Sequence, residues 1–153
     1  MSPIKIWGPA TWTFFHTLID KIRDESFIKI YREVFIMIRI ICMNLPCPDC
    51  TVHAKKFLAS VPLYKISTKL DFKQMMCVFH NSVNIRTRSA AFSLDDLDDR
   101  YRNIPLNASF RRFLATYNTR GTMKFFAEEY QRGQTIKRVN LFLRKNSEHF
   151  THI

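Results

Sequence analysis

The chain has 153 residues, with 24 lysines and arginines against 13 acidic residues and a net charge of +11. Its hydrophobic content of 46%, with 14 phenylalanines, suffices for a core without disulfide staples, and four cysteines are too few for a disulfide scaffold. The apolar run "FIMIRIICM" contains Arg39 and is too short to cross a bilayer, and no signal peptide is recognisable. We therefore expect a cytosolic protein without a membrane span, where reducing conditions disfavour a purely structural disulfide.

The positive charges are spread along the chain, without a basic run of five or more residues. A large basic excess occurs in proteins that bind nucleic acids. A dispersed excess, however, is typical of an ordinary solvated surface. The sequence therefore does not favour nucleic acid as a partner.

Glycine and proline are scarce, with 3 and 6 copies, which favours helices joined by short links. The first predicted helix covers about 8–23, with Pro9 in its first turn. Its apolar face carries Trp12 and His16, one helical turn apart. The second predicted helix, 27–43, is apolar around most of its circumference and should therefore lie centrally in the fold.

Three further helices are predicted in the first two thirds of the chain. One begins at Cys47, where Pro48 suits the first helical position, and ends near residue 60. A long helix covers about 71–89, and a short one is capped by Ser93. Because no segment alternates convincingly between apolar and polar residues, we expect no strand and an all-α fold.

The pattern changes after residue 101. The segment "RNIPLNAS" at 102–109 is typical of a linker, and the chain from about 110 to 150 predicts two or three basic amphipathic helices, broken at Gly121 and Gly133. We therefore divide the chain into a core, 1–103, and a basic helical extension, 104–153. Packing on the core, a partner surface and a nucleic-acid-facing element remain open roles for this extension.

The segment "LPCPDCTVHAKKF" places Cys47, Cys50 and His53 within seven residues. Together with Cys42 they make a set of the soft ligands that zinc prefers, although the order differs from that of zinc knuckles. A C-x-x-C at a helix start also suits dithiol–disulfide exchange, because the free N–H groups and the helix dipole stabilise a thiolate. These residues alone leave a zinc site and a redox centre open, and the lack of a preceding strand argues against a thioredoxin fold.

The segment "CVFHNSVNIRTRSAAF" combines polar and apolar groups on one helix. His80 and Asn84 are spaced to share a face, with Val83 beside them. Arg86 and Arg88 follow as potential phosphate partners. This mixture suits a cofactor that has an aromatic head, a ribose and a pyrophosphate, but a solvated helix face would show the same pattern.

Three segments in order, "WGPATWTFFHTL", "LPCPDCTVHAKKF" and "FHNSVNIRTRSAAF", resemble the Erv/ALR family of FAD-dependent sulfhydryl oxidases. The family's pattern is W-x-x-x-H, then C-x-x-C, then H-N-x-V-N, and the resemblance covers about residues 5–101. It is strongest to the short members encoded by large double-stranded DNA viruses. The resemblance implies an all-α four-helix bundle that holds FAD, with a short fifth helix across one end.

The resemblance also implies a role for each matched residue. Cys47 would exchange with substrate thiols, and Cys50 would pass electrons to the flavin. The residues implied to approach or bind the cofactor, besides Cys50, are Gly8, Thr11, Trp12, His16, His53, Cys77, His80, Asn81, Val83, Asn84 and Tyr101. Many members have a lysine near the phosphates where this chain has Ser89, so Arg86 is our first candidate for the phosphate partner and Arg88 the second. No metal is implied.

In function, the resemblance implies an enzyme that makes disulfides in thiol-containing protein substrates and passes electrons through FAD to dioxygen, giving hydrogen peroxide. The chain has no second, shuttle C-x-x-C, so substrates would reach Cys47 directly or through a thioredoxin-like carrier. Family members commonly dimerise through their first helices, and a homodimer is therefore expected. A viral origin would imply the host cytoplasm or the virion. The alternative function is a zinc-stabilised helical binding module, with nucleic acid as its candidate ligand.

Overall fold

The computed structural model describes residues 4–118 and 126–151. Within these ranges the chain forms α-helices and short 3-10 helices, and Ile22 and Phe150 make an isolated bridge. The α-helices are α1 (Ile4–Asp20), α2 (Phe27–Cys42), α3 (Pro48–Ala59), α4 (Lys69–Arg86), α5 (Leu94–Tyr101), α6 (Leu106–Tyr117) and α7 (Phe126–Lys145). The 3-10 helices are η1 (Asp24–Ser26), η2 (Leu63–Lys65) and η4 (Ser147–His149). The predicted all-α class is confirmed. None of the helices within the described ranges combines the length and apolarity needed to span a bilayer.

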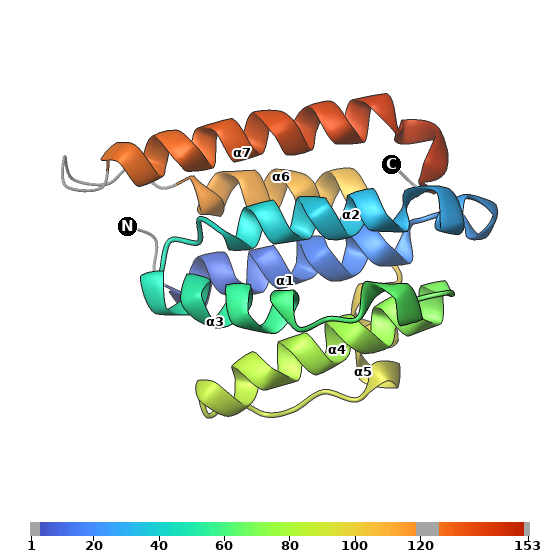
Figure 1. Cartoon of the computed structure of the whole chain (residues 1–153), viewed down its shortest axis with the longest axis horizontal. Helices are drawn as coiled ribbons and strands as arrows, with labels where there is room; N and C mark the ends of the chain where they lie inside the picture. The colour runs from blue at the N-terminus through green and yellow to red at the C-terminus, as the bar shows by residue number, and fades with distance from the viewer. Residues whose placement is uncertain (1–3, 119–125, 152–153) are drawn as a thin grey trace.

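Helix α1 lies at the centre of the fold. It packs against α2, α4, α5 and α6. Figure 1 shows α6 and α7 on one side of it and α3, α4 and α5 on the other. Because it has neighbours on several sides, nearly every residue from Trp7 to Ile19 is buried, the polar ones included.

The contact between α1 and α6 is a seam of aromatic rings. The ring centroid of Phe14 lies 5.1 Å from that of Phe110 and 5.0 Å from that of Phe113. Tyr117 stacks on Phe113 and donates a hydrogen bond of 3.1 Å to the carbonyl of Ile41, at the end of α2. Burial of one such ring contributes about 1.5–3 kcal/mol, so α6 is held firmly against α1 and α2.

Helix α1 begins earlier than the sequence predicts. It starts at Ile4, so the expectation that Pro9 occupies the first turn is wrong. Proline has no N–H, and Pro9 therefore cannot donate to the carbonyl of Lys5 within the helix. Burial of Trp7, which is only 5% exposed, keeps the preceding turn on the core and offsets that loss.

The C-terminal helices also differ from the prediction. The second half of the predicted linker is helical, because α6 begins at the buried residue Leu106. Helix α7 continues through Gly133, so the predicted break there is wrong. Glycine costs a helix about 1 kcal/mol relative to alanine, and burial of Val139 and Phe142 on the inner face of α7 offsets this cost. The predicted break at Gly121 lies outside the described residues.

Helix α4 ends three residues before the predicted end, in a Schellman motif. The N–H of Ser89 donates to the carbonyl of Asn84 at 2.8 Å, and that of Arg88 donates to the carbonyl of Ile85 at 3.2 Å. Arg88 adopts a φ of 57°, a left-handed conformation that costs a residue with a side chain about 1–2 kcal/mol. The turn thus reverses the chain directly after Arg86 and leads it back along α4.

Charged groups tie the end of α1 to α4 and α5. Lys73 Nζ lies 2.7 Å from Asp20 Oδ1 and 2.9 Å from Asp98 Oδ1. Lys21 Nζ lies 3.2 Å from Asp20 Oδ2 and donates to the carbonyl of Arg102 at 2.6 Å. Burial acts to raise the pKa of Asp20, but the hydrogen bonds and charges of the two lysines outweigh it and hold that pKa below its ordinary value.

We expect Asp20→Asn to lower the free energy of unfolding at neutral pH by about 1–3 kcal/mol, because both lysines lose a charged partner at a half-buried site. The lowered pKa makes Asp20 stabilising above the unfolded-state value near 4, and this contribution is lost as the pH falls through the folded-state value. The difference in the free energy of unfolding between wild type and Asp20→Asn, measured by urea unfolding, should therefore become smaller in acid.

The matched control is Asp24→Asn. Asp24 pairs with Lys69, but its side chain is 88% exposed. Exposed pairs contribute little, so the stability of this variant should stay close to that of wild type. Equal stability of the two variants would contradict the structural role assigned to Asp20.

Candidate active site

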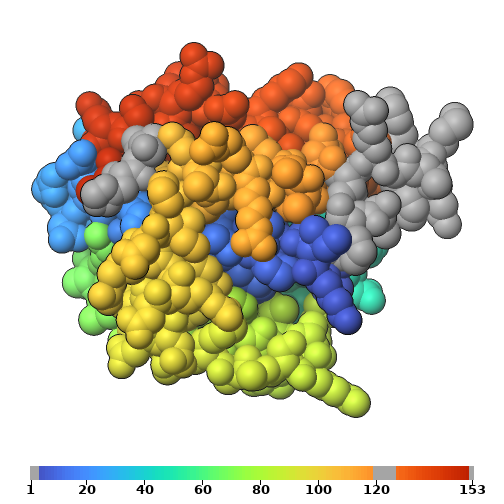
Figure 2. All heavy atoms as spheres, turned by 180° about the vertical axis from the view of Figure 1, so that it is seen from behind, coloured from blue at the N-terminus to red at the C-terminus, as the bar shows by residue number. Residues whose placement is uncertain are grey.

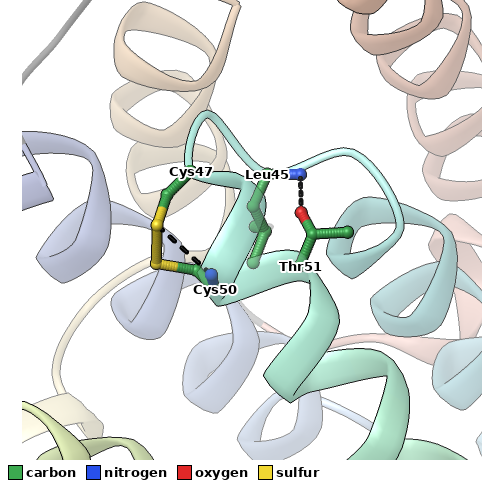
Figure 3. Close-up of a disulfide and its surroundings, with 4 residues drawn as sticks. All are labelled: Leu45, Cys47, Cys50 and Thr51. Atoms are coloured by element: carbon green, nitrogen blue, oxygen red, sulfur yellow. Dashed lines mark hydrogen bonds between the residues drawn. A yellow bond between two sulfur atoms is a disulfide. The ribbon is translucent and has the colours of Figure 1, made fainter.

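A disulfide lies where α3 begins. Cys47 is the N-cap of α3 and Cys50 lies in its first turn, with 5.2 Å between their Cα atoms. The Cys50 N–H donates to Cys47 Sγ at 3.2 Å. On the other side of the same turn, Leu45 N–H donates to Thr51 Oγ1 at 3.1 Å (Figure 3). These contacts fix the loop from α2 against the helix start and thereby hold the disulfide in place.

The two cysteines of this disulfide differ in their surroundings. Cys50 is 8% exposed and forms part of the wall of a cavity. Cys47 is partly exposed and does not line that cavity. The pair therefore has an inner cysteine, Cys50, and an outer cysteine, Cys47, that is accessible from solvent.

The cavity has a volume of about 890 Å³ and lies between α1, the start of α3, α4, α5 and α6. Its wall is largely apolar and aromatic, with contributions from Trp7, Trp12, Phe15, Phe79 and Phe92. Figure 2 shows the face on which α6 (orange), the first half of α1 (dark blue) and the segment around α5 (yellow) meet. Both the size and the apolar wall are typical of small-molecule and cofactor sites.

The charged part of the cavity wall is basic. Lys5 of α1, Arg86 of α4, Arg100 of α5 and Arg112 of α6 all line it. Among the described residues, no aspartate or glutamate does so. Four cations without a carboxylate favour an anionic ligand, and arginine pairs well with phosphate.

Ring side chains from α1, α4 and α5 form a stack beside the cavity. The Trp12 indole lies on the His80 ring, with centroids 4.0 Å apart and planes at 9°. His16 Nε2 lies 2.9 Å from His80 Nδ1, and the His16 ring stacks on Tyr101 at 4.8 Å. Trp12, His80 and Tyr101 line the cavity, whereas His16 is buried behind them.

Burial makes these two histidines neutral at physiological pH. Removal from water is the main cause that lowers the pKa of His16 to about 3. Electrostatic repulsion from His80, Arg100 and Lys73 adds to this effect. Desolvation and then Arg100 lower the pKa of His80 to about 4. One ring of the neutral pair donates its N–H and the other accepts it, so the pair forms a fixed polar element of the wall.

Two asparagines of α4 hold the segment that closes the cavity before α5. Asn81 Nδ2 donates to the carbonyl of Phe92 at 2.8 Å, and Asn81 Oδ1 accepts from the N–H of Phe92 at 2.9 Å. Asn84 Nδ2 donates to the carbonyl of Ala90 at 3.0 Å. Asn84, Ala90 and Phe92 line the cavity, and Asn81 shapes this wall from outside it.

The structure brings most of the predicted site residues to this one cavity. The predicted residues that line it are Gly8, Thr11, Trp12, Cys50, His80, Val83, Asn84, Arg86 and Tyr101. The predicted residues that do not line it are His16, Cys47, His53, Cys77, Asn81 and Arg88.

Three of the residues outside the cavity lie close to its walls or ends. His53 Nε2 is 3.1 Å from Ser82 Oγ and so links α3 to α4, and burial, then Arg86 and Lys56, lowers its pKa. Cys77 Sγ lies 3.7 Å from the carbonyl oxygen of Phe92, and burial raises the pKa of this thiol. Arg88 is exposed at the end of α4.

Sequence reasoning missed several residues of the cavity wall. Those outside the matched pairs include Lys5, Trp7, Phe15, Phe92, Arg100 and Arg112. Trp7 could have been found from the sequence, because it precedes the predicted residue Thr11 by one helical turn. In the structure the carbonyl of Trp7 accepts a hydrogen bond from Thr11 Oγ1 at 2.8 Å. Cys42, which the sequence analysis considered as a zinc ligand, is buried and also lines the cavity.

The residues considered for zinc do not form a ligand set. Cys47 and Cys50 are joined to each other, and His53 contacts Ser82. Within residues 4–118 and 126–151, no group of three or more histidine, cysteine or acidic side chains is placed to hold a metal ion. The disulfide beside a cavity is the chemical feature that the structure presents here.

Comparisons with known proteins match this part of the chain. The Erv1 / Alr family matches residues 9–102. FAD-linked sulfhydryl oxidase ERV1 of Arabidopsis thaliana is 31% identical over 94 residues, covering 61% of this chain and 49% of the relative. The FAD-linked sulfhydryl oxidase of African swine fever virus is 30% identical over 101 residues, covering 66% and 84%. FAD-linked sulfhydryl oxidase ERV2 of Saccharomyces cerevisiae is 29% identical over 77 residues, covering 50% and 39%. No solved structure matches significantly.

The family match and the cavity largely coincide. The chain spans about half the length of the Arabidopsis relative and most of the viral one. The matched segment contains most of α1, all of α2 to α5 and the three motifs from Trp12 to Asn84, whereas α6 and α7 lie outside it. On this match, the chain belongs to the Erv1 / Alr family.

Proposed function

We propose that this protein is an FAD-linked sulfhydryl oxidase that forms disulfides in thiol-containing protein substrates. The observation that carries the proposal is the Cys47–Cys50 disulfide, whose inner cysteine forms part of the wall of a large aromatic and basic cavity. Relatives in its family are named FAD-linked sulfhydryl oxidases. The proposal assigns the oxidase core to 1–103, with 104–153 as a helical extension packed on it.

The cavity suits FAD in size and chemistry. Its volume is about 890 Å³, its aromatic side chains offer flat surfaces for ring systems, and its four cations suit a pyrophosphate. A Cβ added at Gly8 would meet only Ile4 Cγ1, at 3.8 Å, so the protein leaves room above the backbone there.

We assign residue roles within this proposal. The residues proposed to hold the ring systems and ribose are Gly8, Thr11, Trp12, His80, Val83, Asn84 and Tyr101. His16, His53, Cys77 and Asn81 would act from behind the wall, by holding the residues that line it. Arg86 is the first candidate for a phosphate partner because it lines the cavity, and Arg88 the second.

Substrate exchange takes place at the outer cysteine. A substrate thiolate attacks Cys47 Sγ, the Cys47–Cys50 bond breaks, and Cys50 leaves as a thiolate. A second substrate thiolate attacks the substrate sulfur of this mixed disulfide, the substrate disulfide forms, and Cys47 leaves as a thiolate. The greater exposure of Cys47 supports this order.

The resulting dithiol must be reoxidised for another cycle. The chemistry supplied by bound FAD is acceptance of two electrons from the dithiol, with dioxygen as the final acceptor and hydrogen peroxide as the product. Cys50 is suited to this exchange, because it combines a place in the cavity wall with the first turn of α3. The dipole at that helix start favours the thiolate form of a cysteine in the first turn.

The partners of the enzyme follow from the same surfaces. Because the chain has one C-x-x-C, substrate thiols reach Cys47 directly or through a thioredoxin-like carrier. A homodimer built on the first helices would have to use surfaces that α6 leaves open, since Phe14 of α1 is buried against α6 within one chain. A viral origin would place this activity in the host cytoplasm or the virion.

Flavin content tests the proposal directly. Protein purified without added cofactor should be yellow, with a flavin absorbance spectrum and about one FAD per chain. Absorbance measures the FAD content and metal analysis measures the zinc content of the same sample. A colourless protein with one equivalent of zinc would overturn the oxidase and support a zinc-stabilised binding module instead.

Replacement of the inner cysteine tests the electron path. Cys50→Ser should lower oxygen consumption with a dithiol at least about a hundredfold, because the disulfide can no longer form. The flavin absorbance should remain, because a serine hydroxyl fits the space of the thiol. Cys47→Ser should be equally inactive and equally yellow. Wild-type turnover by Cys50→Ser would show that another group reduces the flavin.

The histidine pair predicts a pH dependence of stability. Unfolding returns His16 and His80 from pKa values of about 3 and about 4 to their ordinary value of 6.5, so the unfolded chain takes up protons between these values. The stabilisation is therefore fully present above about pH 6.5 and is lost as the pH falls, by up to about 1.4 kcal/mol per pH unit for each histidine. Urea unfolding at several pH values below 6.5 measures this loss in the free energy of unfolding. A double variant, His16→Gln with His80→Gln, should give a flatter profile, and an unchanged slope would contradict the pKa assignment.

A further inference from the structure

Helix α6 lies outside the family match at 9–102 but forms part of the cavity wall through Arg112. The neighbours of Arg112 on this helix, Phe110 and Phe113, are buried against Phe14 of α1. Core packing therefore fixes the backbone that carries Arg112 before any ligand binds. Binding of an anion then requires ordering of the Arg112 side chain but not of its backbone.

Arg112 and Tyr101 both line the cavity. Burial raises the pKa of Tyr101, while the nearby positive charges of Arg100 and Arg112 act in the opposite direction. The guanidinium of Arg100 also lies 4.6 Å from the centroid of the Phe92 ring. Two guanidinium groups, one from α5 and one from α6, therefore line the cavity and act on the same tyrosine.

Neither of these guanidinium groups is held in a close ion pair within the described part of the chain. No carboxylate there pairs with Arg100 or Arg112 within 4.0 Å, and no acidic side chain lines the cavity. A guanidinium presents parallel N–H groups that match two phosphate oxygens. An adjacent pair of phosphates would supply acceptor oxygens to both arginines.

We propose that Arg112 binds the pyrophosphate of FAD, together with Arg100, so that α6 is a working part of the cofactor site. The inference rests on the proposed function and extends it to a helix outside the family match. It adds a phosphate partner on the wall formed by α5 and α6, where none of the three sequence motifs supplies a residue.

Binding measurements on the full-length apoprotein test this inference. Arg112→Ala should raise the Kd for FAD about tenfold or more, the usual effect of losing a charged hydrogen-bond partner. Arg111→Ala is the matched control, because Arg111 is an exposed neighbour on the same helix that does not line the cavity. It should change the Kd by less than about twofold. Circular dichroism establishes that both variants are folded, and Arg112→Gln provides a second variant of similar length.

Ligand fragments separate a phosphate contact from general damage to the cavity. ADP, which carries a pyrophosphate, should bind Arg112→Ala more weakly than it binds wild type, whereas riboflavin, which has no phosphate, should bind both alike. Equal FAD affinities of the Arg112→Ala and Arg111→Ala proteins would overturn the inference, as would an equal loss for riboflavin. A wild-type protein that binds no FAD would instead overturn the proposed function.

Discussion

The burial of α1 on several sides is the constraint on which the rest of the structure depends. One side of this helix packs Phe14 into the aromatic seam with α6, and another places Trp12 and His16 beside α4 and α5. Residue spacing along a helix is fixed, so a shift of α1 that improved one side would disturb the others. The geometry of the cavity and the packing of the C-terminal helices are therefore coupled, although they involve different side chains.

The parts of the site that could be predicted are those whose signals are local. The Trp12–His16 and His80–Asn84 pairs depend only on helical spacing, and the start of α3 depends only on the residues around Pro48. Each signal was ambiguous alone. Their order along the chain makes the resemblance to a family specific. The observed bounds of α1 to α5 lie within a few residues of the predicted ones.

The remainder could not be predicted, because it depends on contacts between segments that are distant in sequence. A net charge of +11 does not tell which cations gather at one cavity, since the packing of α6 on α1 brings Arg112 there. Leu106 and Gly133 are further examples. Local preference predicts a linker at Leu106 and a helix break at Gly133, but both residues lie in helices whose inner faces are buried. The free energy of that burial outweighs the local preference.

The segment between α4 and α5 is held less firmly than the helical walls of the cavity. It is a non-helical part of the wall, held to α4 largely through the side chains of Asn81 and Asn84. Each such hydrogen bond contributes only about 1 kcal/mol, far less than separating α1 from α4 or α6 would require. The cavity is therefore closed on one side by a segment that costs far less to open than the helical walls around it.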